Sequence, residues 1–160
     1  MMTPFGKEAD IYFMNQALAQ AKKAFAKDEV PVGAVVVSPQ GTIIARGHNY
    51  VESKHTQAAH AEVQALVKAG KKVADWRLEG YWLYVTLEPC AICMNLIYLS
   101  RLAGVVYGAK SPLFGYRHLD NNGSSSLYKK DAVMVIADIC GQEAAQLLRT
   151  FFKEKRNKSG

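Results

Sequence analysis

Residues 81–93 read YWLYVTLEPCAIC and decide the fold of this chain. The first seven residues are aromatic, β-branched or leucine, which is typical of a buried strand, and Pro89 suits the approach to the first turn of a helix. Cys90 and Cys93 then stand three positions apart, so a helix that begins at Cys90 places both thiols on one face. The stretch therefore predicts a strand and a helix with two thiols at their junction.

A histidine and a glutamate lie about thirty residues before these thiols, in the segment His60-Ala61-Glu62. Thiolate and imidazole are ligands that Zn²⁺ prefers, and the partial positive charge of a helix N-terminus favours the thiolate. Three protein ligands leave one tetrahedral position open, which is typical of a catalytic site. We therefore expect one Zn²⁺ per chain, held by His60, Cys90 and Cys93. Glu62 stands where a carboxylate would accept a proton from an activated water.

The rest of the chain alternates between helical and strand patterns. Apolar residues recur at helical spacing over about residues 7–27, and β-branched segments at 30–37 and 43–48 predict a hairpin. We expect helices after His60 and Cys90, further strands at 102–108 and 132–136, and a closing helix from Gln142 with inward Ala145, Leu148 and Phe152. Residues 110–130 show the least regular pattern. The alternation predicts an α/β fold, a three-layer α/β/α sandwich with a five-stranded mixed sheet, in a single domain over residues 1–160.

Composition narrows the setting of the protein. The chain has 160 residues, of which 49% are hydrophobic, and no apolar run has the length that a membrane span needs. The N-terminal residues lack the apolar core of a signal peptide. Three cysteines, two of them in the predicted metal site, do not make a disulfide framework. We therefore expect a cytoplasmic protein that does not contact a membrane.

Much of the net charge of +6 lies at the C-terminus, where residues 149–160 contain five basic side chains and one acidic side chain. A basic end binds polyanions through counterion release, which makes Lys153, Lys155 and Arg156 candidate RNA-binding residues. The same charges would also complement the dipole of a helix C-terminus without any ligand. The charge run alone leaves both interpretations open.

The two site segments match the H-x-E and P-C-x-x-C pattern of zinc-dependent nucleobase deaminases. On these residues the chain resembles the cytidine deaminase superfamily and, more narrowly, the bacterial tRNA-specific adenosine deaminases. The resemblance covers about residues 8–156 and includes four flanking segments, Glu29-Val30-Pro31-Val32-Gly33-Ala34, Gly47-His48-Asn49, Ser100-Arg101 and Val106-Tyr107-Gly108-Ala109. It departs from the family pattern at Ser111, where the family usually has an aspartate, and over residues 112–122.

The resemblance implies a cytidine deaminase-like fold in which the second strand lies outside the first and the others follow in chain order. It implies zinc bound by His60, Cys90 and Cys93, proton transfer by Glu62, and a hydrogen bond from Asn49 to the purine. The implied reaction converts adenosine to inosine at the anticodon wobble position of tRNA and releases ammonia. The implied partners are a tRNA anticodon stem-loop, whose base is flipped into the pocket, and a second copy of the chain in a homodimer.

Three other classes remain open on the residues alone. A free nucleobase or nucleoside deaminase acting on guanine or cytosine would share every metal ligand. A thioredoxin-like redox protein would use Cys-x-x-Cys without His60 or Glu62. A structural zinc module that binds RNA would need a fourth ligand. The candidates for that fourth ligand are Cys140 and the remaining histidines, His48, His55 and His118. Cys140 is however expected to be a small buried hydrophobe, and these histidines are expected on the surface or in loops.

Overall fold

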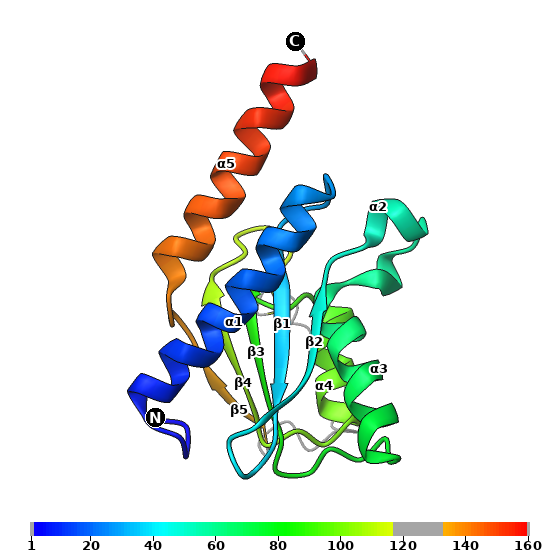
Figure 1. Ribbon diagram of the computed structural model, residues 1–160, viewed down its shortest axis with the longest axis vertical. Coiled ribbons are helices and arrows are strands. Elements are labelled where there is room, and N and C mark those ends of the chain that lie inside the picture. Colours follow the sequence, from blue (N-terminus) through cyan, green and yellow to red (C-terminus); the bar gives the residue numbers. More distant parts are fainter. Residues whose placement is uncertain (1, 117–132, 160) are drawn as a thin grey trace.

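The computed structural model describes residues 2–116 and 133–159. Figure 1 shows helices on both faces of one sheet. In chain order the elements are α1 (Lys7–Ala26), β1 (Gly33–Val37), β2 (Ile43–His48), α2 (Val51–Lys54), the 3-10 turn η1 (Gln57–Ala59), α3 (Ala61–Val73), β3 (Trp82–Leu87), α4 (Ala91–Leu99), β4 (Gly104–Ala109), β5 (Met134–Ile136) and α5 (Gly141–Ser159).

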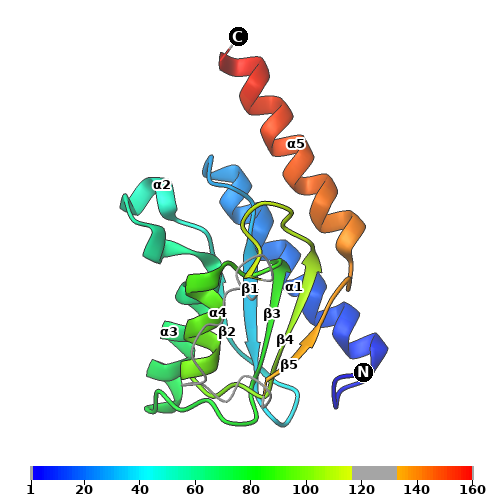
Figure 2. The ribbon, with the colours of Figure 1, turned by 180° about the vertical axis from the view of Figure 1, so that it is seen from behind.

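The sheet has five strands in the order β2-β1-β3-β4-β5. β1 is antiparallel to β2 and β3, whereas β3, β4 and β5 run parallel. α1 and α5 cover one face, and α3 and α4 cover the other (Figures 1 and 2). The predicted three-layer sandwich, its mixed sheet and the strand order implied by the resemblance are therefore confirmed.

The two-residue period of the strands builds two cores from one sheet. On β1, Val35 and Val37 pack with Phe13 and other residues of α1, whereas Ala34 and Val36 pack in the cluster that α3 and α4 share. All five residues of β1 and all six of β4 are buried, which explains their continuous apolar sequences. On α4, Met94 and Ile97 are buried in this second cluster, and Tyr98 packs against it half-buried.

Gly47 allows β2 to lie directly against the first turn of α3. A Cβ atom at this position would stand 2.7 Å from the carbonyl oxygen of Ala61 and 2.7 Å from the amide nitrogen of Ala65. Both are backbone atoms, so no side-chain rotation can make room. The position of the first turn of α3 therefore depends on the missing side chain of residue 47.

The closing helix has a different inward face from the one the sequence predicts. Ala144 and Phe151 are buried, and Phe152 is 45% exposed, so the inward assignment of Phe152 is wrong. Leu147-Leu148 and Phe151-Phe152 are adjacent apolar pairs, so the sequence alone allows either member of each pair to face inward. Contact with α1 selects Phe151, whose ring lies 5.5 Å from that of Phe25. The C-terminal half of α5 projects beyond the sheet (Figure 1), so no described element covers the apolar side chains on the other side of this half of the helix.

Across the described residues, no helix combines the length and the apolar character that crossing a membrane requires.

Candidate metal centre

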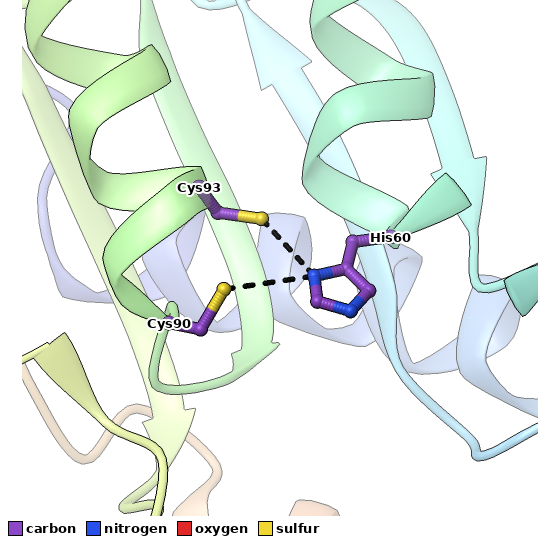
Figure 3. A group of neighbouring side chains, drawn as sticks. All are labelled: His60, Cys90 and Cys93. Atoms are coloured by element: carbon purple, nitrogen blue, oxygen red, sulfur yellow. Dashed lines mark hydrogen bonds between the residues drawn. The ribbon is translucent and has the colours of Figure 1, made fainter. Parts of the chain in front are cut away.

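The N-termini of α3 and α4 bring the predicted ligands together on the side of the sheet that these two helices cover. His60 is the N-cap residue of α3, Cys90 is the N-cap residue of α4, and Cys93 lies in the first turn of α4. The Nδ1 atom of His60 lies 3.3 Å from Sγ of Cys93 and 3.6 Å from Sγ of Cys90 (Figure 3). The three residues therefore present one nitrogen and two sulfur atoms to a common point.

The spacing of these atoms fits zinc. All three ligand atoms lie within 4.8 Å of one another. Zinc binds sulfur at about 2.3 Å and nitrogen at about 2.0–2.1 Å, so tetrahedral angles place the two kinds of ligand atom roughly 3.5–3.6 Å apart. Among the described residues this is the group that offers such a geometry. Cys140 packs instead with the apolar clusters on the α1 side of the sheet, and His118 lies outside the described residues.

Gln57 supplies the outer contact of the histidine. Its Oε1 atom lies 3.0 Å from Nε2 of His60. An amide oxygen only accepts hydrogen bonds, so Nε2 carries the ring proton and Nδ1 keeps its lone pair for a metal. The sequence analysis missed Gln57, because no motif marks it; its position three residues before a ligand, in a turn, is the only signal that was there to find.

The metal-free cluster holds its protons unevenly. A hydrogen bond from the Cys93 thiol, with a further one from His60, lowers the pKa of Cys90 to about 4. The bond to Cys90 and burial raise the pKa of Cys93, and the bond to Cys90 also raises the pKa of His60. Any protons that these ligand groups hold must leave as a metal binds.

Glu62 lies against the three ligands. It stands in the first turn of α3 with 4% of its surface exposed. Burial raises the pKa of its carboxyl, which also interacts with the charge of His60 and with the Cys93 thiol. A buried carboxyl with a raised pKa holds a proton more readily than an exposed one, which suits a group that takes up a proton and passes it on.

Asn49 follows β2 and is held by backbone groups on both sides. Its Nδ2 donates to the carbonyl of Val30 at 3.2 Å, and its Oδ1 accepts from the amide of Val51 at 3.1 Å. The side-chain amide is therefore fixed in orientation, with one N–H and one lone pair left over. The predicted contact with a purine stays a prediction.

The loop after β4 is tied to the segment that carries the thiols. The amide of Ser111 donates to Oε1 of Glu88 at 3.3 Å, and the amide of Tyr116 donates to the carbonyl of Pro89 at 3.0 Å. The divergent stretch is thus anchored next to Cys90 at its start, and from residue 117 it lies outside the described residues.

The three candidate RNA-binding residues lie on the projecting end of α5, not at the metal centre. Lys155 is paired with Asp28, with 2.7 Å between Nζ and Oδ2. Lys153 and Arg156 lie together with Arg149 along one exposed face of α5. The structure therefore places Lys153 and Arg156 on one surface of α5 and Lys155 on another, beside Asp28, and leaves their contact with RNA a prediction.

Zinc-dependent deaminases are the class of protein that this sheet, these helix N-termini and a buried glutamate define. Residues 7–109 match the family described as the cytidine and deoxycytidylate deaminase zinc-binding region. The chain belongs to this zinc-binding family, and His60, Cys90 and Cys93 are the group of described residues that could hold the metal. Membership in this family excludes the redox interpretation of Cys-x-x-Cys.

Individual relatives match this chain over more of its length than the family model does. The tRNA-specific adenosine deaminase of Bacillus subtilis (strain 168) is 41% identical over 149 residues, which cover 93% of this chain and 92% of that protein. A solved structure from studies of A-to-I editing by tRNA:A34 deaminases at the wobble position of transfer RNA has a TM-score of 0.76 and 34% identity, and the match covers 86% of this chain and 99% of that one. The guanine deaminase of Bacillus subtilis has a TM-score of 0.62 and 32% identity over 71% of this chain and 76% of its own.

Proposed function

We propose that the protein hydrolyses the amino group of adenosine in tRNA, at the anticodon wobble position, to give inosine and ammonia. The observation that carries this proposal is the match to tRNA-specific adenosine deaminases over more than nine tenths of both chains. The substrate would be the anticodon stem-loop, whose single-stranded nucleotides cost less to flip than those of a duplex. The enzyme is therefore an RNA-modifying hydrolase.

The side chains divide the work between binding and proton transfer. Zinc, when bound, lowers the pKa of a water to about 7 and so supplies the nucleophile for C6 of adenine. The Glu62 carboxylate takes one proton from the attacking water and delivers it to N1 of the purine, where it stays in inosine. It then takes the second proton from the hydroxyl added at C6 and gives it to the amino group, which leaves as ammonia when the C–N bond breaks. The buried position of Glu62 keeps bulk water from competing for that proton. Asn49 orients the purine through the free part of its fixed amide.

Replacing Glu62 with Gln tests this assignment. The amide keeps the size of the side chain but cannot carry the proton, so we expect a zinc-loaded protein whose rate of inosine formation is lower by roughly 10²–10⁴-fold. Metal analysis and sequencing of the cell's own tRNA provide the two measurements. Glu79→Gln, an exposed acid on the loop before β3, is the matched control. A zinc-replete Glu62→Gln protein with full activity would refute the role.

A second candidate function is the deamination of a free base. The likeness to a guanine deaminase favours guanine as its substrate. Both functions use the same metal ligands, so only the substrate separates them. Parallel incubations with tRNA, adenosine, guanine and cytosine discriminate, because inosine in tRNA supports the first function and xanthine or uracil supports the second.

We also propose that the protein is a homodimer formed through α4. Ile92 is 60% exposed and Leu99 is 49% exposed, and they stand two helical turns apart on one face, with the half-buried Leu96 between them. Leu113 and Phe114, which follow β4, add further exposed apolar surface. A second copy of the chain would remove this surface from water.

An Ile92→Asp/Leu99→Asp variant tests the dimer by sedimentation velocity at micromolar concentration. We expect a monomer, because each carboxylate would have to be desolvated in the interface. Val67→Asp, at an exposed position of α3, is the control and should stay dimeric. A monomeric wild-type protein or a dimeric double variant would contradict the proposal.

The setting follows from the same chemistry. Cys90 and Cys93 must stay reduced to bind zinc, and a reducing cytoplasm keeps them so. We propose that residues 1–160 act there as a single zinc-dependent deaminase domain. A protease-resistant fragment of full length in the zinc-loaded protein, and shorter fragments after chelation, would support one metal-dependent unit.

A further inference from the structure

A second basic cluster lies around the ring of Tyr50. Nζ of Lys27 donates to the Tyr50 hydroxyl at 2.8 Å and lies 4.7 Å from the ring centroid. Nζ of Lys54 lies 5.2 Å from the same centroid. One lysine follows α1 and the other ends α2, so the fold brings two ammonium groups to one aromatic ring.

A buried histidine holds this cluster in place. The ring of His48 lies 4.3 Å from that of Tyr50, and its Nε2 atom is 3.3 Å from Nζ of Lys27. Burial, together with the charge of Lys27, lowers the pKa of His48 to about 4. The imidazole is therefore neutral and able to accept a hydrogen bond from Lys27 through Nε2, while Nδ1 faces Oε1 of Gln20 at 3.4 Å.

The positive charge of the two lysines is not neutralised by the nearby acids. Glu29 is fully buried and accepts from the amides of Glu52 and Ser53 at 2.7 and 2.9 Å, which fixes the start of α2. Asp28 is paired with Lys155. No carboxylate of a described residue forms an ion pair with Lys27 or Lys54. The cluster thus offers two ammonium groups to a ligand of negative charge.

The cluster stands beside the metal centre. The amide of Tyr50 donates to the carbonyl of Ala59 at 2.9 Å, and Ala59 directly precedes the metal ligand His60. Tyr50 also directly follows Asn49, the predicted purine contact. α2 and the C-terminal end of α1 lie at the same end of the domain (Figures 1 and 2). A ligand bound at the two lysines would therefore need to extend only a short distance to the metal centre.

We propose that Lys27 and Lys54, positioned by Tyr50 and His48, bind a backbone phosphate of the RNA strand beside the reactive nucleotide. This inference rests on the tRNA substrate proposed above. A flipped base is held in register by contacts to its flanking backbone, and lysine binds phosphate as a point charge. Tyr50 and His48 keep the two charges together, so little side-chain freedom is lost when the phosphate arrives.

The test removes both charges from the zinc-loaded protein. The probe is a synthetic anticodon stem-loop RNA with adenosine at the wobble position, and its dissociation constant is measured across a series of salt concentrations. Each phosphate of a single strand that the protein neutralises contributes roughly 0.7 to the slope of log affinity against log salt, so loss of the one phosphate contact in Lys27→Gln/Lys54→Gln should lower the slope by about 0.7. We expect binding at moderate salt to weaken by roughly tenfold or more.

The matched control is Lys71→Gln/Lys72→Gln, which removes the same charge from the last turn of α3, at the opposite end of that helix from His60. Its salt slope should equal that of the wild-type protein. A Lys27→Arg/Lys54→Arg variant should restore the slope, and Tyr50→Phe, which removes the hydroxyl that Lys27 contacts, should give intermediate affinity. Zinc content and circular dichroism verify each variant, and the two single Lys→Gln variants replace the double one if it fails to fold.

An equal salt slope in Lys27→Gln/Lys54→Gln and in the control would overturn the phosphate site. The wild-type arm keeps this result separate from the proposed function, because inosine formation in the same RNA is measured alongside binding. Inosine formation with an unchanged slope removes only the phosphate site. A wild-type protein that neither binds nor deaminates the RNA removes both proposals.

Discussion

Replacing Gly47 with Ala would press β2 against α3 and so displace the metal ligand at the start of that helix. The added Cβ would stand 2.7 Å from two backbone atoms of α3, whereas ordinary contact begins at 3.4 Å, so the helix must withdraw by about 0.7 Å. Overpacking of this kind costs about 1–3 kcal/mol, and the midpoint of thermal unfolding falls by about 2–4 °C for each kcal/mol in a domain of this size. We therefore expect a midpoint that is lower by roughly 2–12 °C.

The displacement should also weaken zinc binding. His60 moves with α3 while Cys90 and Cys93 stay on α4, and metal–ligand distances tolerate only about 0.2 Å of change. We expect the zinc affinity of Gly47→Ala to fall at least about tenfold. Gly70→Ala is the matched control in the same helix, because an added Cβ would meet no atom outside the helix closer than 3.4 Å. That variant should gain about 0.5–1 kcal/mol and keep its zinc affinity.

Two measurements check this reasoning. Thermal unfolding of the chelator-treated protein reports the packing cost, and competition with a chromophoric chelator reports the zinc affinity. If Gly47→Ala and Gly70→Ala changed both quantities alike, the contact between β2 and α3 would not be what positions His60.

Three further outcomes follow from the contacts of single side chains. Gln57→Ala should weaken zinc binding about tenfold by removing the acceptor of the His60 ring proton, and Gln57→Glu should restore it in the same chelator competition. Zinc affinity should fall as the pH drops from 8 to about 6, because the raised pKa values of Cys93 and His60 make zinc compete with protons; pH-independent binding would contradict this. Because the pKa of His48 is lowered from 6.5 to about 4, the unfolded chain binds the extra proton between these values, so the free energy of unfolding should decrease as the pH falls through this window. Urea titrations should show that this decrease is absent from His48→Gln.

The metal ligands were predictable because their geometry is local. A thiol pair three positions apart and a histidine at a helix start are placed by the helix itself, and the alternation of strands and helices brings both starts to one end of the sheet. Gln57 was not predictable, since its contact with His60 depends on how the turn before α3 closes. The buried position of His48, expected on the surface or in a loop, likewise depends on the end of β2 meeting α1.

The limits of periodicity are visible in α5. Paired apolar residues at 147–148 and 151–152 satisfy two helical phases equally well, and the choice between them is made by Phe25, which is more than a hundred residues away in the chain. The bonds of Asn49 to Val30 and Val51 were equally hidden, because one of its partners lies on the connection before β1.

The hydrogen bond between Tyr50 and Ala59 joins the two ends of the intervening segment, which therefore forms a closed loop. Substitutions between Tyr50 and Ala59 change the side chains presented to a substrate near the metal centre, while the backbone that leads into His60 keeps its position. Such a loop is a natural unit for grafting: an exchanged segment of equal length that keeps Gln57, the contact of the His60 ring, would carry new recognition chemistry into the enzyme without re-engineering its metal centre.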